Sequence, residues 1–184
     1  GPDALVHAQD KLVMRRAVQR LGLPNPRWAE VHTSEDLVAF GESTGWPVVL
    51  KTPRGGYDGK GVLLVDGPEA AARGTAAEWF ERSARAAGGT GLLAEEAVPF
   101  SRELSAMVAR ERGVTGVMAV ELFETPGTDA GFAVNELAMR PHNSGHWSMD
   151  GAVTGQFEQH LRAVLDWPLG ATEPVAGAAV MKNV

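Results

Sequence analysis

The sequence predicts an α+β fold built from antiparallel strand pairs with helices beside them. Short β-rich runs occur in pairs, one around a glycine-rich loop near residue 55 and another around "PGTDA" near residue 128. Segments whose apolar residues recur at helical spacing stand before, between and after these pairs. A chain of 184 residues with this mixture of elements fits one or two small domains.

The first helix is predicted in "DALVHAQDKLVMRRAVQRLGLPNP". Leu5, Ala8 and Leu12 fall near one face of a single continuous helix. Gly22 and Pro24 follow the last apolar positions and are typical of a helix end. One long helix is therefore expected to lead into the first strand pair.

A second helix is predicted in "HTSEDLVAFGESTG", which has its own start signal. Thr33 or Ser34 can cap the free backbone amides of the first turn. Glu35 and Asp36 then lie in that turn, where the helix dipole favours negative charge.

The remaining elements are expected in chain order. Strands in "WPVVLKT" and "GVLLV" flank the glycine-rich loop, and "GPEAAARGTAAEWFERSARA" is expected to form one surface helix. Strands follow in "GLLAEEAVPF" and "RELSAMVAR", and a hairpin joins "TGVMAVELFET" to "GFAVNEL". The last helix is predicted in "GAVTGQFEQHLRAVLDWP", where Val153, Phe157, His160, Leu161 and Val164 stand at helical spacing. We expect His160 to be a core or surface histidine rather than a ligand.

Composition and charge narrow the classes of partner. A hydrophobic content of 44% is enough for a core, and the net charge of -6 argues against a nucleic-acid binder held by a broad basic surface. The absence of cysteine excludes disulfides, thiolate metal sites and a cysteine nucleophile. No apolar run approaches the roughly 20 residues of a membrane span, and "GPDALVHAQDK" does not resemble a signal peptide. We therefore expect a soluble cytoplasmic protein with a small-molecule partner, no nucleic acid and no membrane.

The stretch "LKTPRGGYDGKG", from Leu50 to Gly61, is the first candidate binding element. It is not a Walker P-loop, because Arg54 stands where glycine is needed and Gly61 stands where serine or threonine is needed. The spacing also fails the dinucleotide-binding pattern. Two interpretations remain: a flexible hairpin tip, or a cover whose bare amides approach phosphate oxygens beside the point charge of Lys51.

Two carboxylates on the predicted hairpin form the second candidate. If the turn centres on residues 127–130, Glu121 pairs directly with Glu136, on one face of the sheet with Ala119, Phe123 and Val134. Like charges opposed among apolar neighbours need an offset, which a divalent cation such as Mg²⁺ would supply. The alternative is a register shifted by one residue, or carboxylates that point to water. Strand alternation also places Asn135 on the other face, unless a twist or bulge intervenes.

The third candidate is the donor-rich loop "RPHNSGHW". Arginine suits bidentate binding of phosphate or carboxylate, and histidine suits proton transfer near neutral pH. The alternatives are a capping role for Asn143 or Ser144 and a structural role for one histidine. The candidate side chains are those of Arg140, His142, Asn143, Ser144 and His146.

Six stretches carry a family resemblance that covers nearly the whole chain. They are "AQDKL", "KTPRGGYDGKG", "EEAVPFSRELS", "GVMAVELF", "NELAMRPHNSGHW" and "GQFEQHLRAV", in this order. The chain resembles the ATP-grasp ligases, specifically the 5-(carboxyamino)imidazole ribonucleotide synthases of purine biosynthesis. The resemblance implies two antiparallel sheets with flanking helices that enclose ATP. It also implies that bicarbonate and ATP give carboxyphosphate, which carboxylates aminoimidazole ribonucleotide and releases ADP and phosphate without biotin.

The resemblance further implies roles for individual residues. Those expected to bind ATP are Lys11, Lys51, Gly55, Gly56, Gly59, Glu95, Glu96, Val98, Glu103 and Asn135, with "EEAV" meeting the adenine edge. Those expected to bind bicarbonate and the aminoimidazole nucleotide are Tyr57, Asp58, Gly59, Lys60, Arg140, His142, Asn143 and Ser144. Among these, Tyr57, Lys60, Arg140 and His142 are the expected catalytic residues. Glu121 and Glu136 are expected to hold Mg²⁺, or Mn²⁺ in its place, and a homodimer is implied.

The same resemblance suggests how the chain is divided. We expect a leading helical segment in residues 1–31, a small subdomain with the glycine-rich loop in 32–97, a large subdomain in 98–170, and the start of a further domain in 171–184. The family carries an additional amino-terminal domain, a long stretch between "VARER" and "GVTGV", and a carboxy-terminal domain, which we expect this chain to lack. The alternatives to a working synthase are an isolated fragment that binds nucleotide without turnover, or another ATP-grasp purine-pathway carboxylase or formyltransferase.

Overall fold

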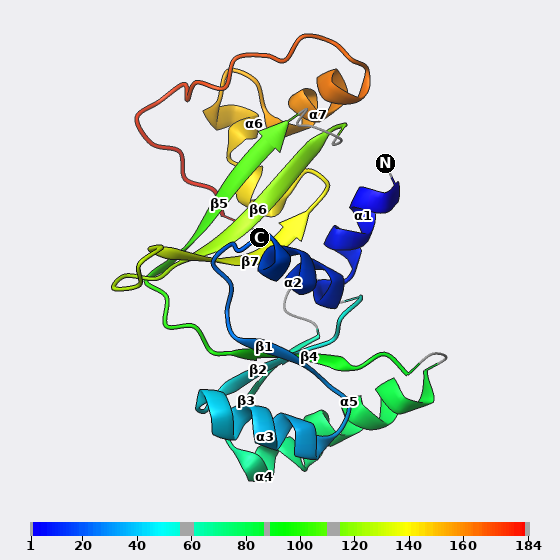
Figure 1. The fold of residues 1–184 in the computed structure, drawn as a ribbon. Helices are drawn as coiled ribbons and strands as arrows, with labels where there is room; N and C mark the ends of the chain where they lie inside the picture. The colour runs from blue at the N-terminus through cyan, green and yellow to red at the C-terminus, as the bar shows by residue number, and fades with distance from the viewer. Residues whose placement is uncertain (1, 56–60, 87–88, 110–114, 183–184) are drawn as a thin grey trace.

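Two antiparallel sheets form two lobes that face each other in the computed structural model of the chain (Figure 1). The structure describes residues 2–55, 61–86, 89–109 and 115–182. The first sheet has the strand order β1-β4-β2-β3, and the second has the order β5-β6-β7. The strands are β1 (Trp28–Val31), β2 (Val48–Lys51), β3 (Val62–Val65), β4 (Leu92–Glu96), β5 (Arg102–Ala109), β6 (Val117–Glu124) and β7 (Phe132–Ala138). The predicted α+β class with two antiparallel sheets is confirmed.

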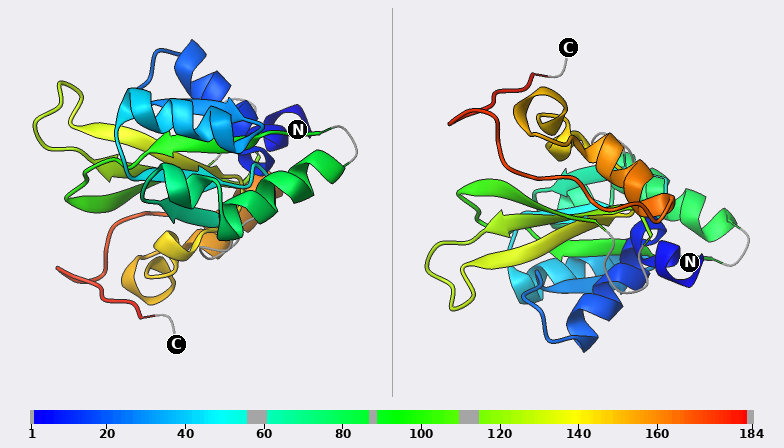
Figure 2. Two further views of the ribbon diagram at one scale, coloured as in Figure 1. Left: turned by 90° about the horizontal axis from the view of Figure 1, so that it is seen from below. Right: turned by 90° about the horizontal axis from the view of Figure 1, so that it is seen from above.

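Helices flank both sheets. They are α1 (Pro2–Gln9), α2 (Lys11–Arg20), α3 (Ser34–Thr44), α4 (Pro68–Ala71), α5 (Gly74–Arg85), α6 (Ser148–Gly151) and α7 (Gln156–Val164), with a 3₁₀ turn at Asn143–Gly145. Seen from below, α3 to α5 cover the outer face of the first sheet (Figure 2). That face supplies Val48 and Leu50 to a core that also holds Leu37 and Phe80 from the helices. Among the described residues, no helix combines the length and apolarity that a membrane span requires.

The N-terminal helix is broken, which corrects the prediction of one continuous helix. Asp10 is extended (φ -130°, ψ 110°) and separates α1 from α2. Its carboxylate accepts hydrogen bonds from the backbone N–H groups of Leu12 and Val13, at 3.0 and 3.2 Å. An aspartate in this role caps a new helix instead of continuing the old one. The apolar residues keep their helical spacing across the break, so the sequence pattern could not reveal the break.

The second helix begins as predicted, whereas the third is split. Thr33 caps α3 in a capping box with Asp36. The predicted surface helix after β3 is two helices, α4 and α5. Gly74, at φ +57°, begins α5, in a conformation that side chains disfavour. The continuous helix expected there is therefore wrong.

A bulge in β7 decides which residues of the hairpin share a face. Glu121 pairs with Glu136 as predicted, but the next pair is Leu122 with Val134, which leaves Asn135 as the extra residue. Val134 therefore shares a face with Leu122 and packs against Met14 of α2. The expectation that Val134 accompanies Glu121 is wrong, because the inserted residue reverses the alternation.

Helix α7 presents its apolar stripe to solvent. It begins at Gln156 rather than near residue 151, so Val153 lies outside it. Its buried positions include the polar residues Gln156 and Gln159. Phe157, Leu161 and Val164 are 45%, 59% and 49% exposed. The stripe that the spacing identified is thus not part of the described core.

Buried Arg15 of α2 joins the two lobes. Its side chain is fully inaccessible, and its Nε donates to the Glu95 carboxylate on β4. Its Nη1 and Nη2 donate to the carbonyl oxygens of Val134 and Asn135, at 2.6 and 2.9 Å, and Nη1 also donates to Asn25 Oδ1 at 2.8 Å. The guanidinium therefore donates to acceptors in both lobes: the Glu95 carboxylate in the first and the backbone carbonyls at the bulge in the second.

We predict that Arg15→Ala lowers the free energy of unfolding by about 3–5 kcal/mol, because it leaves buried acceptors and the Glu95 charge without their main partner. The matched control is Arg16→Ala. Arg16 is 53% exposed and pairs with Glu30 at the surface, so its removal should cost about 1 kcal/mol or less. Urea unfolding of the two variants measures both values. Equal losses would show that Arg15 does not hold the lobes together.

Candidate functional site

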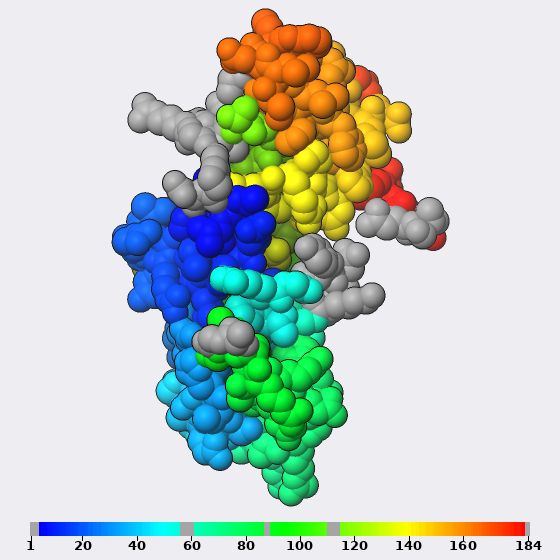
Figure 3. Space-filling model, turned by 90° about the vertical axis from the view of Figure 1, so that its right-hand side faces the viewer, coloured from blue at the N-terminus to red at the C-terminus, as the bar shows by residue number. Residues whose placement is uncertain are grey.

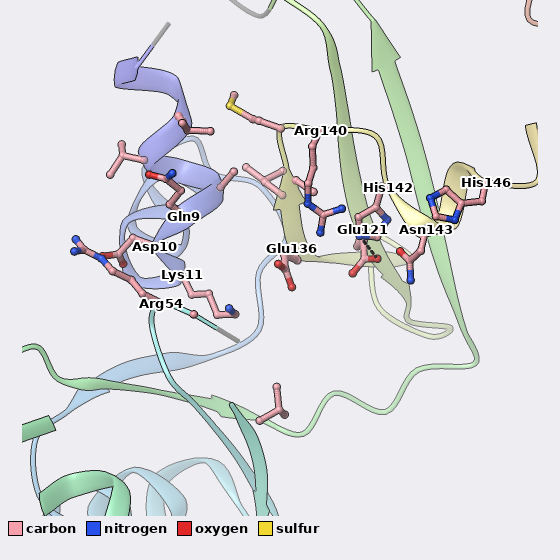
Figure 4. Close-up of a pocket in the computed structure, with 18 residues that line it drawn as sticks. Gln9, Asp10, Lys11, Arg54, Glu121, Glu136, Arg140, His142, Asn143 and His146 are labelled. Atoms are coloured by element: carbon pink, nitrogen blue, oxygen red, sulfur yellow. Dashed lines mark hydrogen bonds and ion pairs between the residues drawn. The ribbon is translucent and has the colours of Figure 1, made fainter. Parts of the chain in front are cut away.

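A cleft of about 970 Å³ lies where the helices α1 and α2, the second sheet and the loop after β7 meet. In the space-filling view the N-terminal helices, in blue, lie against both lobes (Figure 3). The labelled side chains that line the cleft include Lys11, Glu121, Glu136, Arg140 and His142 (Figure 4). With Arg54 and Gly55 of the glycine-rich stretch, the cleft therefore gathers members of all three candidate groups, which extend from Arg54 to His146 and are separated by up to 92 residues in the sequence.

Lys51 and Glu95 form a buried ion pair on the inner side of the first sheet. Lys51 Nζ lies 2.7 Å from Glu95 Oε2, and Arg15 holds Oε1 of the same carboxylate. Burial by itself raises the pKa of Glu95, but the charges and hydrogen bonds of Lys51 and Arg15 outweigh it and lower that pKa. Both oxygens of Glu95 are thus engaged within the protein, and its contact with an adenine base stays a prediction.

The break at Asp10 ties α2 to the glycine-rich loop. Lys11 N donates to the carbonyl of Pro53 at 3.0 Å, and Arg54 Nε lies 2.8 Å from Asp10 Oδ2. Gly55 lines the cleft. The Lys11 amine extends toward Glu136 in the same space (Figure 4). The remaining loop residues, Gly56, Tyr57, Asp58, Gly59 and Lys60, lie outside the described residues.

Three polar side chains stand in one row across the second sheet. Ser105 of β5 pairs with Glu121 of β6, which pairs with Glu136 of β7. The two carboxylates project toward the first lobe (Figure 4). Burial and then the charges of Glu136 and Glu103 raise the pKa of Glu121. The predicted opposition of the two glutamates is confirmed, whereas the predicted register holds only as far as this pair and is shifted by one residue from Leu122 onward.

This arrangement fits a divalent cation. Within the described ranges, no three metal-binding side chains are gathered as a preformed site. Mg²⁺ in nucleotide sites commonly takes one or two carboxylates together with substrate phosphates, so a carboxylate pair is a sufficient protein contribution. Burial and the negative charges of Glu136 and Glu103 raise the pKa of Glu121, and the positive charges of Arg140 and Lys51 offset this only in part.

The donor-rich loop brings His142 to Glu121. His142 Nε2 lies 3.3 Å from Glu121 Oε1, and burial followed by the charge of Arg140 lowers the pKa of the histidine. Asn143 and Arg140 line the cleft beside it. The residue that caps the 3₁₀ turn is His142 itself, whose ring accepts from the Ser144 N–H. The capping role that the alternative interpretation gave to Asn143 or Ser144 is filled by the histidine, while Asn143 Oδ1 also accepts from the Ser144 N–H, at 3.0 Å.

Two residues of this network escaped the sequence analysis. Gln156 is buried at the start of α7; it accepts from His142 N at 2.8 Å and donates to His142 O at 2.7 Å. Ser105 lies 2.7 Å from Ser144 through their hydroxyl oxygens. In the sequence, only a glutamine near the apolar positions of the predicted helix could have indicated Gln156. No local pattern indicates Ser105.

The other predicted ATP-binding residues lie at the edges of the site. Glu96 accepts from Arg27 Nε at 2.7 Å and from the Arg27 backbone at 2.8 Å. Glu103 is exposed on β5 but close enough to Glu121 to affect its pKa. Val98 follows β4, and Asn135 is the bulge residue. Their contacts with nucleotide stay predictions.

Two antiparallel sheets that face a cleft, with lysines near one sheet and paired carboxylates on the other, define a nucleotide-binding fold of the ATP-grasp type. The ATP-grasp domain family matches residues 16–114 and 110–157. The chain belongs to this family, which confirms the resemblance seen in its motifs.

Individual relatives show which ATP-grasp proteins the chain is similar to. The chain is 43% identical to the N5-carboxyaminoimidazole ribonucleotide synthase of Mycobacterium tuberculosis, over 100% of this chain and 52% of that protein. Among solved structures, the corresponding synthetase of Thermus thermophilus is 32% identical with a TM-score of 0.69, and covers 95% of this chain and 57% of its own. The carboxyaminoimidazole ribonucleotide synthase of Aspergillus clavatus, complexed with ATP, is 26% identical with a TM-score of 0.71, and covers 89% and 53%.

The chain spans about half the length of the curated relatives it matches. The mycobacterial alignment extends over 232 residues, more than the 184 of this chain, so it contains positions with no counterpart here. The family match divides at residues 110–114, between β5 and β6. This agrees with the expected absence of an internal segment.

We predict that Glu121→Gln raises the melting temperature near pH 7, because the pKa of Glu121 is raised in the fold. A carboxyl group of this kind stabilises the fold below its unfolded pKa of about 4.3, and this contribution is lost as the pH rises through the folded pKa. The gain should disappear at about pH 3. Adding Mg²⁺ with ADP should stabilise the unmodified chain more than the variant.

Glu124→Gln is the matched control on the same strand. Glu124 has a lowered pKa because Arg102 and Ser101 hydrogen-bond to it, so its replacement should not stabilise the chain near pH 7. Differential scanning calorimetry across pH compares the two. An equal response of both variants to pH and Mg²⁺ would remove Glu121 from the cation site.

Proposed function

We propose that the chain is the ATP-grasp part of a ligase that carboxylates 5-aminoimidazole ribonucleotide with bicarbonate, giving 5-(carboxyamino)imidazole ribonucleotide, ADP and phosphate. The observation that carries the proposal is the row of opposed glutamates in a cleft that also holds the donor-rich loop. The names of the relatives and their identity over the whole chain support this substrate. The product would enter purine biosynthesis.

The nucleotide would lie between the two sheets. Lys11 and Lys51 would contact phosphates, and Glu95 would hold Lys51 in place through the 2.7 Å ion pair. The inner face of the first sheet also exposes Val62 and Leu64, which suits an apolar base. The ATP complex of the Aspergillus relative supports ATP as the nucleotide.

Glu121 and Glu136 would hold Mg²⁺, which supplies charge neutralisation to the phosphates when bound. Phosphoryl transfer depends mainly on positioning and on electrostatic stabilisation, so no protein nucleophile is required. Arg140 and Asn143 would orient bicarbonate and the nucleotide substrate from the loop after β7. His142, buried and with a lowered pKa, would donate a hydrogen bond as a neutral ring.

A second candidate function is nucleotide binding without turnover. The observation that favours it is length, since the chain covers 52% of the mycobacterial synthase and 57% of the Thermus structure. Residues outside this chain would then complete the substrate site. A third, related candidate is an ATP-grasp carboxylase or formyltransferase acting on another purine intermediate.

The test is phosphate release from ATP and Mg²⁺, with and without aminoimidazole ribonucleotide and bicarbonate. We expect substrate-dependent release, and loss of that release by at least tenfold in His142→Ala with ATP affinity retained. His32→Ala is the control, since His32 is an exposed histidine of the other lobe. Binding of ATP without release would favour the second candidate, and release with formate in place of bicarbonate the third. No ATP binding at all would contradict all three candidates.

We also propose a homodimer formed through α7. Large apolar side chains are exposed along residues 147–169, namely those of Trp147, Met149, Val153, Phe157, Leu161, Val164, Leu165, Trp167 and Leu169. Contiguous exposed apolar surface of this kind marks an interaction site. Glu158 and Arg162 lie beside the stripe and pair with each other at 2.7 Å, so their charges are balanced within one copy.

We predict that Leu161→Glu converts a dimer into a monomer, because it places a charge in the centre of the apolar stripe. Leu21→Glu is the control, since Leu21 is 70% exposed at the end of α2, away from α7. Analytical ultracentrifugation measures the mass of each. A monomeric unmodified chain, or dimers of both variants, would contradict the proposed interface.

A further inference from the structure

Helix α7 holds the donor-rich loop after β7 through one buried glutamine. Gln156 Oε1 accepts from His142 N at 2.8 Å, and Gln156 Nε2 donates to His142 O at 2.7 Å. A single amide, on a residue that is 5% exposed, thereby satisfies both main-chain groups of the histidine. The loop is thus attached to α7 between Arg140 and Asn143, which both line the cleft.

The end of the loop is held by the same part of the helix. Ser148 Oγ donates to Gly145 O at 2.6 Å and accepts from Gln156 N at 2.9 Å. A Cβ atom at residue 145 would lie 2.6 Å from Gln156 Oε1, so the glutamine can come this close only to a glycine. Both ends of the segment 142–145 therefore rest on the start of α7, and that helix sets the position of the loop.

A second glutamine of α7 makes the same pair of contacts with a different segment. Gln159 Oε1 accepts from Gly170 N at 3.0 Å, and Gln159 Nε2 donates to Gly170 O at 2.7 Å. Gln159 is 6% exposed, so its burial matches that of Gln156. Of the described residues that line the cleft, none belongs to the segment after α7. Gln159 therefore offers a contact of equal chemistry that does not involve the donor-rich loop.

We infer that Gln156 is a positioning residue for the aminoimidazole nucleotide, which holds the loop main chain so that Arg140 and Asn143 point into the cleft (Figure 4). Both of these side chains are flexible, so a fixed main chain beneath them reduces the conformational entropy that binding has to offset. The role toward the nucleotide rests on the proposed function, whereas the attachment of the His142 main chain does not.

The inference distinguishes two ligands of the same cleft. In the proposed function the phosphates of ATP lie at Lys11 and Lys51, at the start of α2 and the end of β2. The Gln156 amide instead bonds to His142. Its removal should therefore weaken binding of the aminoimidazole nucleotide and leave the affinity for ADP nearly unchanged.

The first measurement is hydrogen exchange of the His142 backbone amide in the chain without ligands, followed by NMR. Gln156→Met keeps an unbranched side chain but removes both hydrogen-bonding groups. The His142 amide should then exchange at least fivefold faster, which corresponds to one net hydrogen bond of about 1 kcal/mol. Gln159→Met, the matched control, should accelerate exchange at Gly170 and leave His142 unchanged. Unchanged exchange at His142 in Gln156→Met, or equal acceleration there in both variants, would overturn the attachment.

The second measurement is the affinity for aminoimidazole ribonucleotide and for ADP, by isothermal titration calorimetry. Gln156→Met should weaken binding of aminoimidazole ribonucleotide at least fivefold and change ADP affinity by less than twofold. Gln159→Met should change neither affinity, although urea unfolding should show a similar loss of stability in the two variants. Gly145→Ala, whose added Cβ displaces Gln156 Oε1, should act like Gln156→Met, so the result does not depend on one variant.

The two measurements separate the possible failures. No binding of aminoimidazole ribonucleotide by the unmodified chain would contradict the proposed function, and the exchange at His142 would still decide whether Gln156 holds the loop. Binding that is insensitive to Gln156→Met, or that falls together with ADP affinity, would overturn the positioning role of Gln156. An equal loss in Gln159→Met would show that the effect comes from the stability of α7 and would also overturn that role.

Discussion

The structure depends on one buried guanidinium. Arg15 reaches from α2 to Glu95 in the first lobe and to the Val134 and Asn135 carbonyls in the second, with no part of its side chain accessible to water. A buried charge is tolerated only where its donors are matched, and here each guanidinium nitrogen donates to at least one acceptor, on β4, on β7 or at Asn25. The contact therefore sets how the two lobes face each other. It also leaves the second oxygen of Glu95 for Lys51, so the same interaction fixes the Lys51 ammonium group on the inner face of the first sheet.

Two local irregularities make this contact possible and shape the site. The bulge at Asn135 frees backbone carbonyls for Arg15 and lets Val134 face α2 while Glu136 faces the cleft. The break at Asp10 starts α2 at Lys11 and joins it to Pro53 and Arg54 at the base of the glycine-rich loop. Neither irregularity is a defect, since each replaces a regular hydrogen bond with one that links distant parts of the chain. Regular elements would have produced the same sheets with a different cleft.

The electrostatic arrangement follows from these supports. Glu121 and Glu136 are held opposite each other although burial and then the charge of Glu136 raise the pKa of Glu121. His142 stands beside them, and burial and then the charge of Arg140 lower its pKa. The negative charges of such a site repel each other, and a bound cation with its phosphates would reduce that repulsion. Helix α7 also supports the site, because its first residue, Gln156, hydrogen-bonds to the main chain of His142. The opposite side of the same helix carries the exposed apolar stripe.

The sequence by itself determined the α+β class, the strands β2 to β7 but not β1, the Thr33 cap and the opposition of Glu121 to Glu136, because these depend on local periodicity, capping chemistry and hairpin register. Its motifs also indicated the ATP-grasp family, which the family match confirms. Only the tertiary structure decided the break at Asp10, the face of Val134, the exposure of α7 and the roles of Arg15, Gln156 and Ser105. Each of these depends on a partner far away in the sequence, such as Glu95 for Arg15 or His142 for Gln156. Local patterns carry no information about which buried acceptor a side chain will meet, so such contacts emerge only when the elements pack together.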